Sequence, residues 1–204
     1  MKKIQTSAVG CSIGESIHRV TKREVMAYAA AIGDASDGCF DDIKRDVVAP
    51  LPFCVVLEWP VVSGPRALEA LGVGEAEQSR AVHVSQDTSL TRPLLSGLEI
   101  LTTGSVVEVR STRIGTYVCY LLISQEKSTN EILATSLLGQ IFFGVESEGP
   151  DIALPTPAPR GESASHATAS RAAAKIEVAR GFAHTYTECS PIWNPIHTER
   201  EAAA

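Results

Sequence analysis

Residues 81–143 read AVHVSQDTSLTRPLLSGLEILTTGSVVEVRSTRIGTYVCYLLISQEKSTNEILATSLLGQIFF, and they are rich in Val, Ile, Thr, Leu and Tyr, which favour β-strands. This composition predicts four strands, at Ala81–Leu90, Leu98–Val109, Thr116–Gln125 and Ile132–Phe143. Short runs of turn residues separate them, at Pro93–Gly97, Arg110–Gly115 and Lys127–Glu131. Because connections this short join antiparallel neighbours, we predict an antiparallel meander of at least four strands.

The segment before this sheet carries helix signals. Thr21 and Glu24 are spaced as a capping box, in which each side chain accepts a hydrogen bond from the other residue's backbone amide. Apolar residues then recur at helical spacing until Gly33, where the helix is expected to end.

A second helical region is predicted between Val47 and Val73. We expect it to be interrupted at Pro60, to restart at Pro65, where proline suits the first helical position, and to end at Gly72. Since the helices precede the strands, the order favours an α+β fold with the sheet packed around a helix from residues 50–72.

The composition excludes several classes of protein. The chain has 204 residues, of which 44% are hydrophobic and 21% charged, as is ordinary for a globular protein. A net charge of −6, with no basic cluster longer than Lys22-Arg23, argues against nucleic-acid binding. No stretch reaches the ~18 apolar residues that span a bilayer, so we expect no membrane partner.

The cysteines and the N-terminal segment bear on location and cofactors. There are five widely spaced cysteines without a C-x-x-C pattern, at Cys11, Cys39, Cys54, Cys119 and Cys189. They predict neither a disulfide framework nor a zinc site, and no glycine pattern indicates a phosphate loop, so we expect no metal and no cofactor. Ile4–Gly14 carries polar residues where a signal peptide needs an apolar run, which favours a reducing, cytoplasmic setting.

A change of composition divides the chain. Residues 147–175 contain four prolines and many Ala and Ser residues without apolar periodicity, so we expect an extended, mobile linker. Apolar residues then return, at Phe182, Tyr186, Ile192, Trp193 and Ile196. We therefore expect one domain over residues 1–146, a linker over 147–175 and the beginning of a second folded unit over 176–204.

The last stretch carries a motif. Residues 186–197 read YTECSPIWNPIH, and Ala203 follows six positions after the histidine. The stretch resembles the signature of MaoC-like hotdog (R)-specific enoyl-CoA hydratases, which has an aromatic residue, then Gly-Asp-x-Asn-Pro-aliphatic-His, then five residues and Ala. The matching positions are Asn194, Pro195, Ile196, His197 and Ala203, whereas Pro191-Ile192 stands where the family has Gly-Asp.

This resemblance implies an α+β hotdog fold, in which an antiparallel sheet wraps around a central helix. His83–Asp87, with Arg92-Pro93 and Gly97, is similar to the strand and turn that lead into the sheet of an N-terminal hotdog. Tyr28–Asp34 looks like the helix end that precedes the active loop of such domains. By this likeness, residues 1–146 form an N-terminal hotdog and residues 176–204 the start of a second, incomplete one.

The resemblance also implies a chemistry. In the family, the Asp and the His activate a water that adds to the β-carbon of a trans-2-enoyl thioester, or remove water in reverse, and helix-terminal amides stabilise the thioester oxyanion. It points here to His197 and Asn194 as catalytic residues and to an acyl-CoA or acyl-carrier thioester as the ligand. Ile192 cannot accept a proton. Glu188 lies four residues before Ile192, in a segment that we expect to be strand-like. It is the nearest upstream carboxylate that could take the place of the family's aspartate.

A hotdog thioesterase stays open but is disfavoured, since the Asn-Pro-x-His signature is not that of thioesterases, and the residues favour two other functions. One is an acyl-thioester (enoyl-CoA) hydratase or dehydratase that is weak or inactive alone. The alternative is a non-catalytic acyl-CoA-binding or scaffolding hotdog subunit that pairs with a catalytic hotdog partner. Both predict a homodimer or a hetero-oligomer with another hotdog chain, because a hotdog sheet leaves an edge and an apolar face to be covered.

Other side chains are interpreted as structural. We read His83 as a histidine that is hydrogen-bonded at a strand edge. Aromatic residues on helices and strands usually pack in the core, and this applies to Phe53, Trp59, Phe142 and Phe143.

Overall fold

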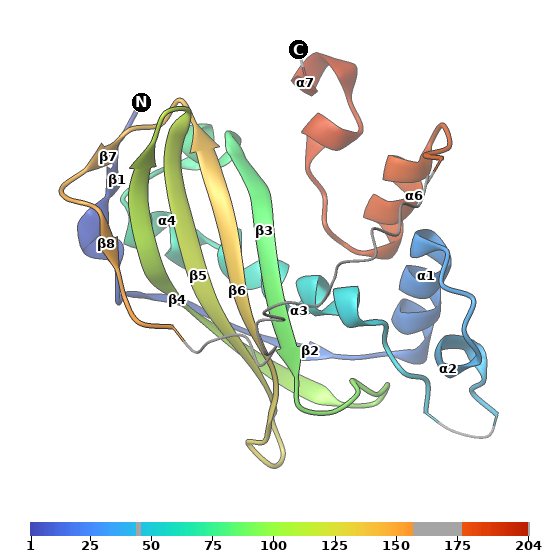
Figure 1. The fold of residues 1–204 in the computed structure, drawn as a ribbon. Helices are drawn as coiled ribbons and strands as arrows, with labels where there is room; N and C mark the ends of the chain where they lie inside the picture. Colours follow the sequence, from blue (N-terminus) through green and yellow to red (C-terminus); the bar gives the residue numbers. More distant parts are fainter. Residues whose placement is uncertain (44–45, 157–176, 204) are drawn as a thin grey trace, which may run out of the picture.

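A computed structural model describes residues 1–43, 46–156 and 177–203. In this part of the chain, six strands form one antiparallel sheet in the order β2-β4-β5-β6-β3, with the short β8 paired to β4 (Figure 1). The strands are β2 (Ser12–Arg19), β3 (Ala81–Leu90), β4 (Glu99–Thr112), β5 (Gly115–Glu126), β6 (Ile132–Phe143) and β8 (Ile152–Ala153). The predicted antiparallel sheet over residues 81–143 is confirmed.

The order of the strands differs from a simple meander. β4, β5 and β6 follow one another, but β3 lies beside β6 at the opposite edge from β4. The connection from β3 to β4 therefore passes the ends of β5 and β6. Within it, Leu94 is fully buried and its carbonyl accepts a hydrogen bond from the Ala49 amide. Turn residues mark where a strand ends but not which strand it pairs with, so the prediction of a meander is wrong for β3.

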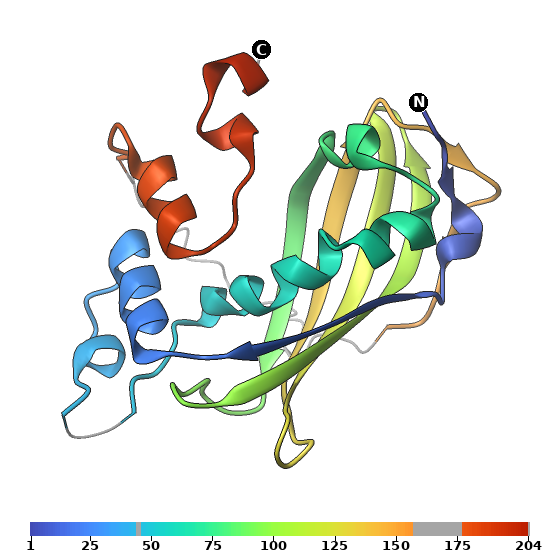
Figure 2. The same ribbon diagram turned by 180° about the vertical axis from the view of Figure 1, so that it is seen from behind.

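The helices pack against one face of this sheet. α3 (Cys54–Val62) and α4 (Pro65–Leu71) run across it, and α1 (Lys22–Ile32) lies beyond the end of α3 (Figure 2). The remaining short helices before β3 are η1 (Thr6–Ala8), α2 (Asp37–Phe40), η2 (Leu51–Phe53) and α5 (Glu75–Gln78). The arrangement confirms the expected hotdog, a sheet packed on a helix from residues 50–72.

Two buried clusters fill the space between the helices and the sheet. One joins α3 and α4 to the sheet and includes Val62, Leu71, Tyr120 and Phe142. The other joins α1 and the start of α3 to β4 and β6, through residues such as Tyr28, Phe53, Leu57 and Leu133. Phe143, by contrast, is 41% exposed, so its expected place in the core is wrong. It follows the buried Phe142 in β6, and successive side chains of a strand point to opposite faces.

The predicted helix boundaries hold at α1 and differ at Pro60. Thr21 and Glu24 make both bonds of the capping box, and Gly33 closes α1 with a left-handed backbone. α3 continues through Pro60 to Val62, because Val61 and Val62 are buried and their packing outweighs the local preference. The break comes at Gly64, where a Cβ would lie 2.7 Å from the Pro60 carbonyl oxygen.

Three segments of the first unit were not predicted as strands, namely residues 4–5, β2 and residues 147–153. β2 pairs with β4 along its length, although its own sequence, SIGESIHR, carries few strand formers. Residues 147–153, assigned to the linker, form β7 (Ser147–Glu148), which pairs with β1 (Ile4–Gln5), and β8. The first unit therefore extends beyond Glu146, and residues 147–153 are not a mobile linker. The rest of the predicted linker, residues 157–175, lies outside the described residues.

The C-terminal segment consists of short helical pieces, the first of which lies beside α1. They are α6 (Phe182–Cys189), η3 (Pro195–His197) and α7 (Arg200–Ala203) (Figure 1). Glu188 thus lies on a helix, which corrects the expected strand-like approach. Trp193, between α6 and η3, is 59% exposed.

Candidate active site

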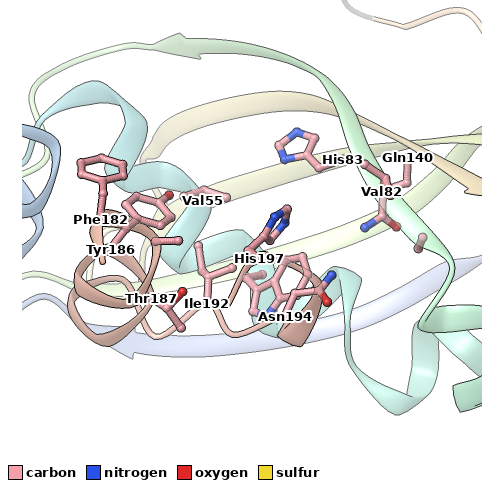
Figure 3. Close-up of a pocket in the computed structure, with 13 residues that line it drawn as sticks. Val55, Val82, His83, Gln140, Phe182, Tyr186, Thr187, Ile192, Asn194 and His197 are labelled. Atoms are coloured by element: carbon pink, nitrogen blue, oxygen red, sulfur yellow. The ribbon is translucent and has the colours of Figure 1, made fainter. Parts of the chain in front are cut away.

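A pocket of about 360 Å³ lies between the C-terminal segment and the first unit. The first unit contributes residues from α3, β3 and β6, namely Val55, Trp59, Ala81, Val82, His83 and Gln140. The C-terminal segment contributes Phe182, Ala183, Tyr186, Thr187, Ile192, Asn194 and His197. Residues more than one hundred positions apart in the chain therefore share one cavity (Figure 3).

Tyr186 holds the C-terminal segment against the first unit. Its ring lies 5.9 Å from that of Tyr28 on α1, with the two planes inclined at 60°, and the two hydroxyl oxygens are 3.5 Å apart. Tyr28 in turn donates from its hydroxyl to the Pro52 carbonyl at 3.0 Å. Burial raises the pKa of Tyr28 well above its ordinary value, so this hydroxyl stays protonated and remains a donor.

The Asn-Pro-Ile-His motif shapes the turn that carries its histidine. Asn194 Oδ1 accepts from the Ile196 amide at 3.3 Å, and Pro195 occupies the first position of the 3₁₀ turn. The His197 amide donates to the Asn194 carbonyl at 3.1 Å. The cap leaves the Asn194 amide nitrogen and the His197 ring facing the pocket (Figure 3).

The other sequence candidates are placed differently. Ile192 lines the pocket near His197, so an apolar side chain occupies the wall where the family motif would place a carboxylate. Glu188 is exposed on α6 and is not among the residues that line the pocket. The structure therefore brings Asn194, Ile192 and His197 together but leaves Glu188 outside.

Sequence reasoning did not assign His83 and Gln140 to the site. His83 makes the hydrogen bond expected at a strand edge, from its Nε2 to the Ser85 carbonyl at 3.0 Å, but it also lines the pocket. Gln140 lies directly opposite it in the β3–β6 register, is 1% exposed, and its Oε1 has no hydrogen-bond partner in the described part of the chain. The only sequence signal was the likeness of His83–Asp87 to a family strand.

The pocket has a polar part and an apolar part. Figure 3 shows the imidazoles of His83 and His197 and the amides of Gln140 and Asn194 around one part. Aromatic and aliphatic side chains surround the other, among them Phe182, Tyr186 and Val55. Trp59 also lines the pocket as well as packing against the core. An apolar pocket with a few convergent polar groups suits a ligand with a polar head and a hydrocarbon part.

Within residues 1–43, 46–156 and 177–203, no group of three or more His, Cys, Asp or Glu side chains is arranged to hold a metal ion. In the same ranges, no helix has the length and apolar character required to cross a membrane.

Comparison with known proteins identifies the family. A family model described as "FAS1-like, dehydratase domain region" matches residues 7–131, which is more than half of the 204 residues. The chain belongs to the FAS1-like dehydratase family. Together with the solved structures below, this confirms the resemblance to MaoC-like hotdog dehydratases. No curated protein matches the sequence of this chain.

Solved structures share its fold. A MaoC-like dehydratase from Phytophthora capsici is 17% identical with a TM-score of 0.72, over 97% of this chain and 67% of that one. HtdX of Mycobacterium tuberculosis is 17% identical with a TM-score of 0.63, over 93% of this chain and 66% of that one. The HadBC (3R)-hydroxyacyl-ACP dehydratase complex of the same organism is 17% identical with a TM-score of 0.50, over 62% of this chain and 90% of that one. This chain thus spans about two thirds of the length of the first two.

Proposed function

We propose that the chain binds an acyl thioester in this pocket and interconverts trans-2-enoyl and 3-hydroxyacyl thioesters slowly. The observation that carries the proposal is the position of His197 and Asn194, which project from the hydratase-like motif into a pocket with a polar and an apolar part. Membership of the dehydratase family supports the same reaction class. The polar part would take the thioester and the apolar part the acyl chain.

The reaction needs two proton movements. In hydration, a base accepts a proton from water, the water oxygen bonds to the β-carbon, and the α-carbon gains a proton. His197 can serve one of these movements, but Ile192 can serve neither. A positioned acid–base group typically contributes ~10²–10⁴-fold to a rate, so we expect slow turnover compared with an enzyme that has the aspartate.

The C-terminal segment would be the start of a second hotdog unit. The motif in residues 186–197 supports this assignment, as does the likeness of nearly the whole chain to a MaoC-like dehydratase. β3 is an edge strand of the first unit, and such an edge is suited to a further hotdog, either in a second copy or in another chain.

The second candidate function is a non-catalytic acyl-thioester-binding subunit that pairs with a catalytic hotdog chain. Ile192 in place of the family's aspartate favours it. The likeness to a subunit of the HadBC complex is consistent with such pairing.

Two measurements on the purified chain test these proposals. Calorimetry with butyryl-CoA, which is saturated and cannot be hydrated, measures binding, and the loss of crotonyl-CoA absorbance measures hydration. We expect butyryl-CoA to bind and crotonyl-CoA to be hydrated slowly, with hydration abolished in His197→Ala. Absence of butyryl-CoA binding would contradict both functions, whereas binding without hydration would favour the non-catalytic subunit.

A further inference from the structure

His83 reaches the pocket through its pairing with Gln140 of β6, at the last regular position before a bulge in its strand. In the pairing of β3 with β6, His83 lies opposite Gln140 and Ser85 opposite Gly139, so the intervening Val84 has no partner and forms a bulge. Directly paired residues point to the same face, and Gln140 is buried on the face that packs against the helices. His83 therefore points to that same face in regular register with β6, although at this sheet edge its side chain remains exposed.

A hydrogen bond to the backbone sets the tautomer of this histidine. The Nε2 atom of His83 is 3.0 Å from the Ser85 carbonyl oxygen. Because a carbonyl can only accept, Nε2 must carry the hydrogen, and the neutral ring then has its lone pair on Nδ1. An imidazole held in this way is a proton acceptor with a fixed orientation, as expected for a general base.

The surroundings of His83 are those of a ligand site. It shares the pocket wall with Gln140, whose amide oxygen is buried without a partner in the described part of the chain. Buried polar groups usually have partners, so an unsatisfied amide at a cavity wall is a place where a bound molecule would complete the hydrogen bonding. His197 stands in the same part of the pocket (Figure 3).

We propose that His83, on the first unit, is the second proton-transfer residue of this site and supplies the base that Ile192 cannot. The inference rests on the proposed function. In hydration, Nδ1 of His83 takes a proton from water as the water oxygen bonds to the β-carbon. The double-bond pair moves onto the α-carbon and thioester carbonyl, and the imidazolium of His197 gives its proton to the α-carbon. Solvent then removes the proton from His83 and restores that of His197. Dehydration is the reverse.

The key variant is His83→Gln, because glutamine keeps an N–H donor for the Ser85 carbonyl but has no basic nitrogen. We expect crotonyl-CoA hydration by the 204-residue chain to fall by about 10²-fold in kcat, the typical size of one acid–base contribution. Butyryl-CoA affinity should stay within twofold. His184→Gln is the matched control, since His184 is exposed on α6 and does not line the pocket; it should leave both quantities unchanged.

The pH profile separates proton transfer from a structural role. The dependence of kcat on pH should differ in shape between the wild-type chain and His83→Gln, because the variant has no basic nitrogen at this position. Two-bond ¹H–¹⁵N spectra of the wild-type chain should show the neutral His83 ring protonated at Nε2, which requires no variant.

Each adverse result has a distinct meaning. An unchanged kcat in His83→Gln, a His83 ring protonated at Nδ1, or butyryl-CoA binding without any wild-type hydration would overturn the role of His83. Failure of the wild-type chain to bind butyryl-CoA would instead overturn the proposed function itself.

Discussion

Glu58 is a carboxylate in the interior of the first unit. It lies on α3 with 1% of its surface exposed, and Gln86 of β3 donates to its Oε2 at 2.9 Å. Burial raises the pKa of Glu58 to about 7, and hydrogen bonds from Ser136 and Gln86 only partly oppose this. Near neutral pH the side chain is therefore divided between its neutral and charged forms.

This carboxyl group should make the protein less stable as the pH rises. The folded chain holds a proton on Glu58 up to about pH 7, while the unfolded chain releases it near the ordinary value of 4.5. Unfolding free energy should therefore fall between these two pH values, by an amount on the order of 3 kcal/mol, and then level off. Denaturant unfolding from pH 4.5 to 8 measures this fall, and Glu58→Gln should remove it.

The control is Glu75→Gln, which removes an exposed carboxylate from α5. It should keep the wild-type pH dependence. A Glu58→Gln variant with the same pH dependence as the wild type would contradict the assignment to Glu58.

Ile192 offers a second prediction at the level of one residue. It lines the pocket five positions before His197, where the family motif has an aspartate. In the His83→Gln background, Ile192→Asp should restore about 10²-fold in kcat for crotonyl-CoA hydration, because a carboxylate can accept the proton of water. Ile192→Asn, which is similar in size and shape to the aspartate but cannot accept that proton, should not. Equal rates in the two variants would show that the polarity of position 192, not its basicity, matters.

At the level of elements, α6 separates two cavities. Tyr186 on α6 and Val55 on α3 line both the site pocket and a neighbouring cavity of about 520 Å³, which also includes Tyr28, Leu51 and Gln86. Tyr186 is thus part of the wall between them. The contact of α6 with α1 keeps its ring in this place, because it packs against Tyr28.

Removing this ring should change the preferred acyl length. Tyr186→Ala would open the site pocket into the neighbouring cavity and let longer chains bury additional methylenes. Two more buried CH₂ groups are worth about 1.6 kcal/mol, so the affinity for decanoyl-CoA relative to butyryl-CoA should rise about tenfold or more. Tyr186→Phe keeps the ring and serves as the control. The same ratio of Kd values in both variants would contradict the role of the Tyr186 ring as a wall between the two cavities.

At the scale of the whole molecule, the first unit contains the core and the C-terminal segment completes the pocket. Both buried clusters consist of residues between Ile4 and Val145, and Tyr186 packs against the margin of the cluster that contains Tyr28. A chain ending at residue 176 should therefore still unfold cooperatively but should not bind butyryl-CoA. Thermal circular dichroism measures the cooperativity of unfolding, and calorimetry measures the binding of butyryl-CoA. Binding with wild-type affinity would place the ligand site within the first unit alone.

Local patterns in the sequence were enough for much of the fold and for part of the site. The capping box of Thr21 and Glu24 depends on residues three positions apart, and the strands over residues 81–143 depend on their own composition. The Asn194–His197 turn likewise follows from a local cap and a proline. Such features need no distant partner, which is why a single sequence indicates them.

Only the tertiary structure decided the rest. β2 is a strand because β4 supplies its hydrogen bonds, and α3 continues past Pro60 because Val61 and Val62 are buried. His83 belongs to the candidate site because its pairing with Gln140 points it to the helix face, and the C-terminal segment brings His197, more than one hundred residues later, to the same pocket. A histidine on an exposed edge strand carries no periodic signal, and its chemistry depends on neighbours that only the folded chain places beside it.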